Sequence, residues 1–176
     1  MKNQVKMYGT TVLPAFIIFS LIPWYGIFYA ALHFGMTSLV LFFILRINNI
    51  QDKKLHYKKR IMRMWLSGVI ASYAGPIYLI FIGYIASSIS INADINKGII
   101  FSIAYATNGY TYHDKWSFLF IVSGIFVSSV SIFLTHFIYS LKKFNIKATY
   151  RVILSFFLAM TTAPYVYLIP SELLPS

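Results

Sequence analysis

The stretch that decides the fold is residues 117–141, SFLFIVSGIFVSSVSIFLTHFIYSL, which contains no Asp, Glu, Lys or Arg. As an α-helix it would be about 37 Å long, because each residue adds about 1.5 Å. The hydrocarbon core of a bilayer is about 30 Å thick, and roughly 20 apolar residues cross it. The segment therefore predicts a membrane-spanning helix.

The composition of the whole chain agrees with this prediction. Of its 176 residues, 59% are hydrophobic and 11% are charged, whereas soluble domains have about 45–50% apolar and about 25% charged residues. The mean hydropathy is +0.70. The chain has no cysteine, which excludes disulfides and thiolate chemistry. We therefore expect an all-α polytopic membrane protein in which residues 1–176 form a single integral membrane domain.

Further apolar segments lie on both sides of residues 117–141. The run from Thr10 to Ile47 is too long for one span, and we place its turn at Pro23-Trp24-Tyr25-Gly26 because Pro and Gly favour turns. No A-x-A site follows the first segment, so we interpret it as a retained helix and not as a cleaved signal peptide. The predicted spans are 7–22, 27–47, 64–87, 117–141 and 152–169. This five-helix bundle becomes a four-helix bundle if the short first segment does not span.

The basic residues are distributed unevenly between the connecting segments. The net charge is +11, and all of the 15 Lys and Arg residues except Lys97 and Lys115 fall on one side of the five-span arrangement. This side carries the basic loops 48–63 and 142–151, and the other side carries the segment 88–116. Because cytoplasmic loops are rich in Lys and Arg, we predict a cytoplasmic N-terminus. We also expect contact with anionic lipid headgroups, worth about 1 kcal/mol per basic residue, and no nucleic-acid partner.

Small residues on two of the spans predict where the helices touch, since membrane helices associate through close packing of such residues. The candidate packing residues are Gly68, Ser72 and Gly75 on one span and Gly124, Ser128, Ser131 and Thr135 on the other. The spacing of four, three and four residues places the second set on one helix face. A polar pathway for a solute is the alternative interpretation. Pro76 and Pro164 are expected to kink their helices.

The spans contain little that could perform chemistry. The four acidic residues, Asp52, Asp94, Asp114 and Glu172, all lie outside the apolar runs. Their positions argue against proton-coupled transport and carboxylate chemistry, which usually place charges inside the membrane. We therefore predict a protein that is not an enzyme and that has no catalytic residues, cofactor or metal.

Two histidines are the candidate intramembrane polar residues. Counting from the ends of the predicted spans places His33 nearer the outer side and His136 nearer the inner side. We expect them at different depths, so that a shared metal ion is not expected. The ordinary alternative for each is a histidine that forms a hydrogen bond between helices.

Residues 101–116, FSIAYATNGYTYHDKW, are the most informative connection. Asn108-Gly109 between alternating residues predicts a β-hairpin, whereas a competing interpretation makes 98–107 a short interfacial or re-entrant helix. An element at 98–116 could merely cap the bundle or could dock another protein, for which aromatic residues are suited. The candidate docking residues are Tyr105, Tyr110, Tyr112, His113 and Trp116.

Together these features suggest a non-enzymatic protein of the bacterial cytoplasmic (inner) membrane that binds another membrane-inserted protein. An immunity protein against a pore-forming bacteriocin and an accessory subunit of a larger complex are two forms of this hypothesis. The alternative is a small channel or transporter without carboxylate-based proton coupling. Its pathway would be lined by Ser, Thr and Gly of the last three spans.

Overall fold

The computed structural model describes residues 23–47, 52–92, 97–107, 114–144 and 146–168, and these residues are almost entirely helical, with no strand among them. The α-helices are α2 (Pro23–Ile47), α3 (Lys53–Ser72), α4 (Ala74–Asn92), α5 (Lys97–Thr107), α6 (Lys115–Leu134) and α7 (Ala148–Thr161). The shorter elements are the π-helical turn η1 (Thr135–Ser140) and the 3₁₀ turns η2 (Leu141–Lys143) and η3 (Tyr165–Leu168).

Three helical segments are long and apolar enough to cross a membrane, namely Ile27–Ile47, Lys53–Ala86 and Lys115–Lys143. This finding confirms the all-helical fold and agrees with the membrane-protein class. The predicted span 7–22 lies outside the described residues. The bounds of the predicted span 152–169 are corrected, because the helix at this place, α7, begins at Ala148, ends at Thr161 and has 14 residues. Pro164 explains the end, since the residue before a proline avoids helical geometry.

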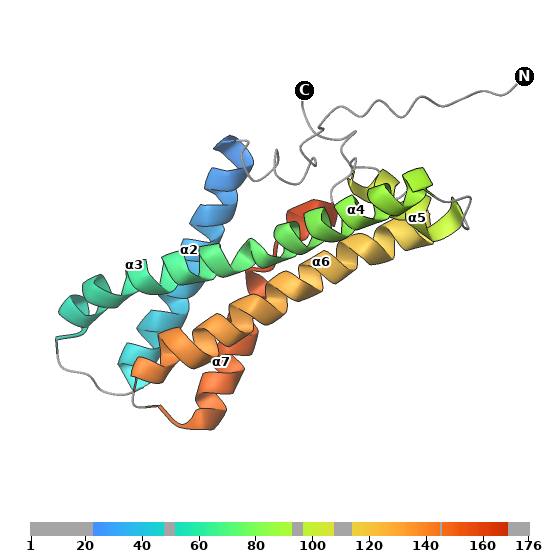
Figure 1. The fold of residues 1–176 in the computed structure, drawn as a ribbon. Helices are drawn as coiled ribbons and strands as arrows, with labels where there is room; N and C mark the ends of the chain where they lie inside the picture. Colours follow the sequence, from blue (N-terminus) through green and yellow to red (C-terminus); the bar gives the residue numbers. More distant parts are fainter. Residues whose placement is uncertain (1–22, 48–51, 93–96, 108–113, 145, 169–176) are drawn as a thin grey trace, which may run out of the picture.

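The helices form an elongated bundle. Helices α3 and α4 follow one another as an almost continuous rod, and α6 runs beside this rod in the opposite direction (Figure 1). Helix α2 crosses the rod obliquely, and α7 packs against α6 near the end where α6 continues into η1. Helix α5 contacts α4 and α6 at the other end of the bundle.

The rod is interrupted at Tyr73, where α3 ends and α4 begins. Pro76 explains the interruption, because proline has no amide hydrogen and its ring pushes away the carbonyl four residues earlier, here that of Ser72. The freed carbonyl of Ser72 accepts a hydrogen bond of 2.7 Å from the hydroxyl of Ser128. The amide of Gly75 in turn donates to the Ser128 oxygen at 3.1 Å. The break expected at Pro76 is therefore present, and α6 supplies the partners that the broken turn needs.

The predicted loop 48–63 is wrong from Lys53 onward, where α3 begins. Tyr57, Ile61 and Met64 are spaced four and three residues apart, so they lie on one helix face. Ile61 and Met64 are buried, and Tyr57 packs against the same hydrophobic cluster. Most of the charged side chains of this segment are exposed, as expected for an amphipathic helix. Charge density alone therefore pointed to a loop where the apolar spacing indicated a helix.

The predicted hairpin is also wrong in its first arm, because α5 covers Lys97–Thr107. The competing interpretation of a short helix is the correct one for these residues, while Asn108-Gly109 lies outside the described residues. Asp114 begins α6 as its N-cap, since its carboxylate accepts hydrogen bonds of 2.8 Å from the amides of Trp116 and Ser117. The same carboxylate contacts the hydroxyl of Ser102, which ties α5 to α6.

Candidate functional site

The candidate packing residues divide between two different contacts. A Cβ atom built on Gly75 would lie 2.2 Å from both the carbonyl oxygen of Gly124 and the hydroxyl of Ser128. A Cβ atom on Gly124 would lie 2.5 Å from the side chain of Leu79. Helices α4 and α6 therefore meet through these glycines, together with the buried Ser72 and Ser128. Ser131 and Thr135 are half-buried further along α6 and η1.

Gly68, by contrast, faces two histidines. The rings of His33 in α2 and His136 in η1 lie with their centroids 6.3 Å apart and their planes tilted by 31°. Both side chains have an exposed fraction of 0%. The prediction that they lie at different depths is wrong. It assumed that every helix crosses the membrane upright, whereas α2 crosses the bundle obliquely (Figure 1).

The absence of a side chain on Gly68 is what allows the two rings to meet. A Cβ atom built there would lie 2.3 Å from Cε1 and 2.6 Å from Nε2 of His33, and 2.8 Å from Nε2 of His136. Distances under 3 Å are not tolerated by real Cβ atoms. The two Nε2 atoms therefore approach a single point beside the backbone of α3. We call this arrangement of His33, Gly68 and His136 the histidine pair.

The ring nitrogens of the histidine pair are only partly satisfied. Nδ1 of His33 lies 3.2 Å from the hydroxyl of Thr37, one turn further along α2. Nε2 of His33 and both ring nitrogens of His136 have no hydrogen-bond partner among the described residues. A buried polar atom without a partner costs about 1–3 kcal/mol, so such atoms call for an explanation.

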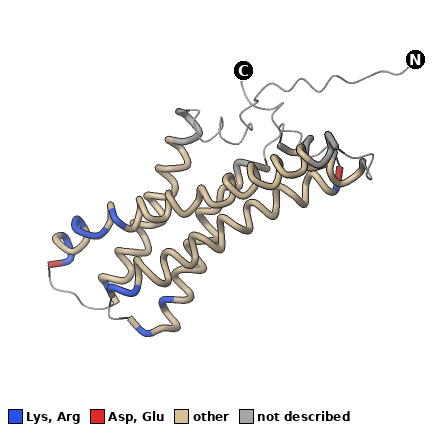
Figure 2. Tube along the Cα trace, in the orientation of Figure 1, with Lys and Arg blue, Asp and Glu red and all other residues tan. Residues whose placement is uncertain are grey.

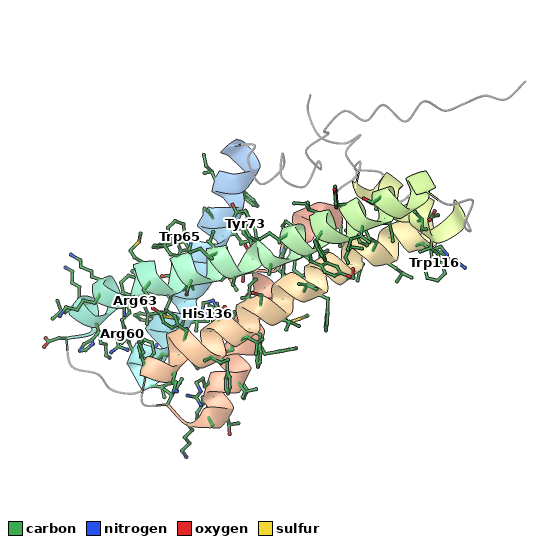
Figure 3. The ribbon with its side chains drawn as sticks, viewed as in Figure 1. Arg60, Arg63, Trp65, Tyr73, Trp116 and His136 are labelled. Atoms are coloured by element: carbon green, nitrogen blue, oxygen red, sulfur yellow. The ribbon has the colours of Figure 1, made fainter. Side chains whose placement is uncertain are left out.

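One aromatic side chain packs against the histidine pair, and two serine hydroxyls lie within one turn of its members along α3 and η1. Tyr29 packs edge-on against His33 with a centroid distance of 6.1 Å, and its hydroxyl donates to the carbonyl of Thr162 at 2.6 Å. The hydroxyls of Ser67 in α3 and Ser140 in η1 lie 3.1 Å apart. His136 itself belongs to a π-helical turn, a distortion that is frequent at functional sites. Figure 3 shows His136 inside the bundle, away from both of its ends.

His33, His136 and Gly68 were each candidate residues in the sequence, but nothing in the sequence indicated that they meet, and Thr37 was not among the candidates. The spacing of His33 and Thr37, four residues apart, is a signal that could have indicated their hydrogen bond. The π-helical turn has no comparable signal in the sequence.

A second feature is the basic end of the bundle, where the C-terminus of α2 and the N-termini of α3 and α7 come together with η2. Figure 2 shows that most of the Lys and Arg residues of the described segments gather there. Arg60 helps to hold this end together, because its guanidinium donates to the carbonyl of Lys143 at 3.1 Å and lies 4.3 Å from the ring centroid of Phe144. The basic end is therefore packed as well as charged.

The two candidate docking residues that the structure describes, Tyr105 and Trp116, belong to α5 and α6 at the opposite end of the bundle. Trp116 in the first turn of α6 is 42% exposed, and the ammonium of Lys115 lies 5.5 Å from its ring centroid. Figure 3 shows Trp116 far from Arg60 and Arg63 of the basic end. Tyr105 belongs to α5, whereas Tyr110, Tyr112 and His113 lie outside the described residues.

A third feature is an apolar face along the rod of α3 and α4, which we call the outer stripe. Its large side chains are exposed and recur every three or four residues, so they share one helix face. The members are Leu66, Ile70, Tyr73, Ile77, Phe81 and Tyr84. Between Leu66 and Tyr84 the inward face of the same rod carries mainly small residues together with one large one. They are Gly68, Ala71, Ser72, Gly75 and Gly83, and Leu79.

Among the described residues, no three His, Asp or Glu side chains gather at one place that could hold a metal ion. The histidine pair is thus a two-ligand arrangement in the part of the chain that the structure covers. Comparison of the chain with protein-family models, with curated proteins and with solved structures finds no match.

Proposed function

We propose that the chain is a non-enzymatic integral protein of a bacterial cytoplasmic (inner) membrane that binds another membrane-inserted protein. The observation that carries this proposal is the outer stripe. From Leu66 to Tyr84 it extends about 27 Å at about 1.5 Å per residue, close to the thickness of the hydrocarbon core. A partner helix could therefore pack along its whole length.

The tyrosines of the outer stripe favour a protein partner over lipid alone. Tyr73 lies near the middle of the rod and is 42% exposed. Lipid tails offer its hydroxyl no hydrogen-bond partner, whereas a side chain or carbonyl of another protein can do so. Large aromatic side chains also contribute strongly to the binding energy of interfaces.

We further propose a five-span topology with the N-terminus in the cytoplasm. The gathering of basic residues at one end supports it, because the positive-inside rule then places that end in the cytoplasm. Anionic headgroups would bind there. The segment around Trp116 would lie on the outer side, where Tyr105, Tyr110, Tyr112 and His113 remain candidates for docking the same partner.

Two forms of the binding hypothesis differ in the partner. An immunity protein would hold a pore-forming bacteriocin in a closed state within the bilayer, and an accessory subunit would join a resident membrane complex. The channel or transporter alternative has less support, because Ser72, Gly75 and Ser128 use their polar atoms to bind one another and so do not offer them to a solute. Its main support is the histidine pair, whose ring nitrogens are only partly paired.

Site-specific photo-crosslinking in membranes tests the proposal. A photoreactive amino acid replaces Ile77 in the outer stripe, and a matched variant carries it at Phe126 on α6, since the two side chains are similarly exposed at 63% and 68%. The chain is produced together with the membrane proteins encoded by its neighbouring genes and is also challenged with pore-forming bacteriocins. We expect one discrete protein adduct from position 77 and only lipid adducts from position 126.

A variant separates binding from folding. Tyr73→Phe keeps the shape and the apolar character of the outer stripe but removes a hydroxyl, so it should weaken the adduct at position 77 without changing membrane insertion. Lipid adducts alone at both positions, combined with solute flux through reconstituted protein, would contradict the proposal and favour the channel.

A further inference from the structure

We propose that the histidine pair binds a monovalent soft metal ion, Cu(I) or its redox-stable analogue Ag(I), between the Nε2 atoms of His33 and His136. The geometry is the first argument. Nε2 of His33 and Nε2 of His136 lie 2.6 Å and 2.8 Å from the position that a Cβ atom of residue 68 would take, so the two nitrogens are at most about 5.4 Å apart. Two metal–imidazole bonds of about 2.0–2.1 Å each span about 4 Å. A small closing movement of the two rings would place an ion in contact with both nitrogens.

The hydrogen bonds of the rings are the second argument. Histidines that bind metals usually donate the hydrogen of their other ring nitrogen to a fixed acceptor. The hydroxyl of Thr37, 3.2 Å from Nδ1 of His33, is such an acceptor. With the hydrogen on Nδ1, Nε2 carries a lone pair, and this is the atom that has no partner among the described residues. Thr37 therefore acts as a positioning residue.

The surroundings select the charge of the ion. Asp52 and Asp114, the acidic residues that the structure describes, lie at the N-terminal ends of α3 and α6 and not beside the histidine pair. The charged groups that contact η1 are both cationic, since the ammonium of Lys143 lies 4.6 Å from the ring centroid of Tyr139 and the guanidinium of Arg151 lies 4.7 Å from that of Phe137. These groups oppose the binding of a multiply charged cation. The cost of burying an ion rises steeply with its charge. Among the metals that imidazole binds well, copper offers a monovalent state that is satisfied by two neutral ligands.

The test uses the purified full-length chain in detergent. Native mass spectrometry in chloride-free buffer measures how many Ag(I) ions each chain binds, and competition with the chelator ferrozine under anaerobic conditions measures the affinity for Cu(I). We expect one ion per chain. Ag(I) should also raise the thermal unfolding temperature of the wild type, because a ligand that binds only the folded state stabilises it.

Variants assign the site. His33→Phe and His136→Phe should each lower the affinity about 100-fold or more, and Thr37→Val should lower it about 10-fold, the effect expected for a residue that orients a metal ligand. Gly68→Ala keeps both histidines but its Cβ atom would displace both rings, so it should also abolish binding. His56→Phe is the matched control, because His56 lies in the basic first turns of α3 and should leave the affinity unchanged.

The His136→Phe variant keeps the test decisive even if Gly68→Ala fails to fold. If its unfolding temperature is insensitive to Ag(I) while that of the wild type rises, the ion binds at the histidine pair. Three results would overturn the proposal. They are no binding by the wild type, a preference for Zn²⁺ over Ag(I), and binding that persists in the double variant His33→Phe/His136→Phe. Persistent binding would mean that other side chains, such as the six methionines, hold the ion.

Discussion

Among the polar contacts inside this bundle, the contact of Ser72, Gly75 and Ser128 and the histidine pair differ in whether their polar atoms are paired. Between α4 and α6, the hydroxyl of Ser128 donates to the carbonyl of Ser72 and accepts from the amide of Gly75. In the histidine pair, three of the four ring nitrogens have no partner among the described residues. Helix packing explains the serine contact completely, whereas it leaves the histidine pair unexplained.

The largest effect is expected where two backbones meet. A Cβ atom at Gly75 would lie 2.2 Å from the backbone oxygen of Gly124, so Gly75→Ala must push α4 and α6 apart. We expect a loss of about 3 kcal/mol, the upper range for overpacking a core, in the free energy of unfolding measured by denaturant titration in micelles. Gly35→Ala is the control, because nothing lies within 4 Å of a Cβ atom there. Equal stability of both variants would show that α4 and α6 do not meet through Gly75.

The corresponding change in the histidine pair should cost less. A Cβ atom at Gly68 would collide with side-chain atoms of His33 and His136 and not with another backbone. The rings can turn away, so we expect Gly68→Ala to destabilise the fold by about 2 kcal/mol, measured by the same titration. A second substitution, His136→Ala, should recover part of the loss because it frees space beside residue 68. No recovery would mean that Gly68 contacts something else.

The serine contact and the histidine pair also differ in how far the sequence foretold them. Gly75, Gly124 and Ser128 were selected because small residues three or four apart share one face, and the structure places them in contact. The spacing of small residues predicts a contact correctly where two neighbouring helices run side by side, because residues at the same height along the two helix axes then face one another.

The histidine pair could not be found in that way. His33 and His136 lie on helices that cross obliquely, so their distances from the helix ends do not give their relative depths. The π-helical turn around His136 also changes the direction in which its side chain points relative to a regular α-helix, and no residue pattern predicts such a turn. Similarly, the charges of residues 53–63 concealed a helix whose inward face, with Ile61 and Met64, carries the usual apolar spacing.

A smaller effect is expected from removing a single hydroxyl. Ser128→Ala leaves the carbonyl of Ser72 and the amide of Gly75 without their shared partner. Hydrogen bonds between membrane helices contribute about 0.6 kcal/mol on average and up to about 1.7, so we expect a loss of about 1 kcal/mol. Ser129→Ala is the control, since the hydroxyl of Ser129 bonds only within its own helix, to the carbonyl of Ile125. A similar loss of stability in both variants would mean that the hydrogen bonds of Ser128 to Ser72 and Gly75 do not contribute to the free energy of unfolding.

The smallest effect, and the sharpest distinction between the two contacts, is expected from His136→Phe in metal-free protein. The substitution keeps a flat ring of similar size but removes two nitrogens that have no partner among the described residues. Removing buried polar atoms that have no partner forfeits no hydrogen bond, so the free energy of unfolding should not fall below that of the wild type. A loss of about 2 kcal/mol or more would mean that these nitrogens are paired in the folded protein. His136 would then be a structural residue like Ser128, and its conformation would no longer need a ligand to explain it.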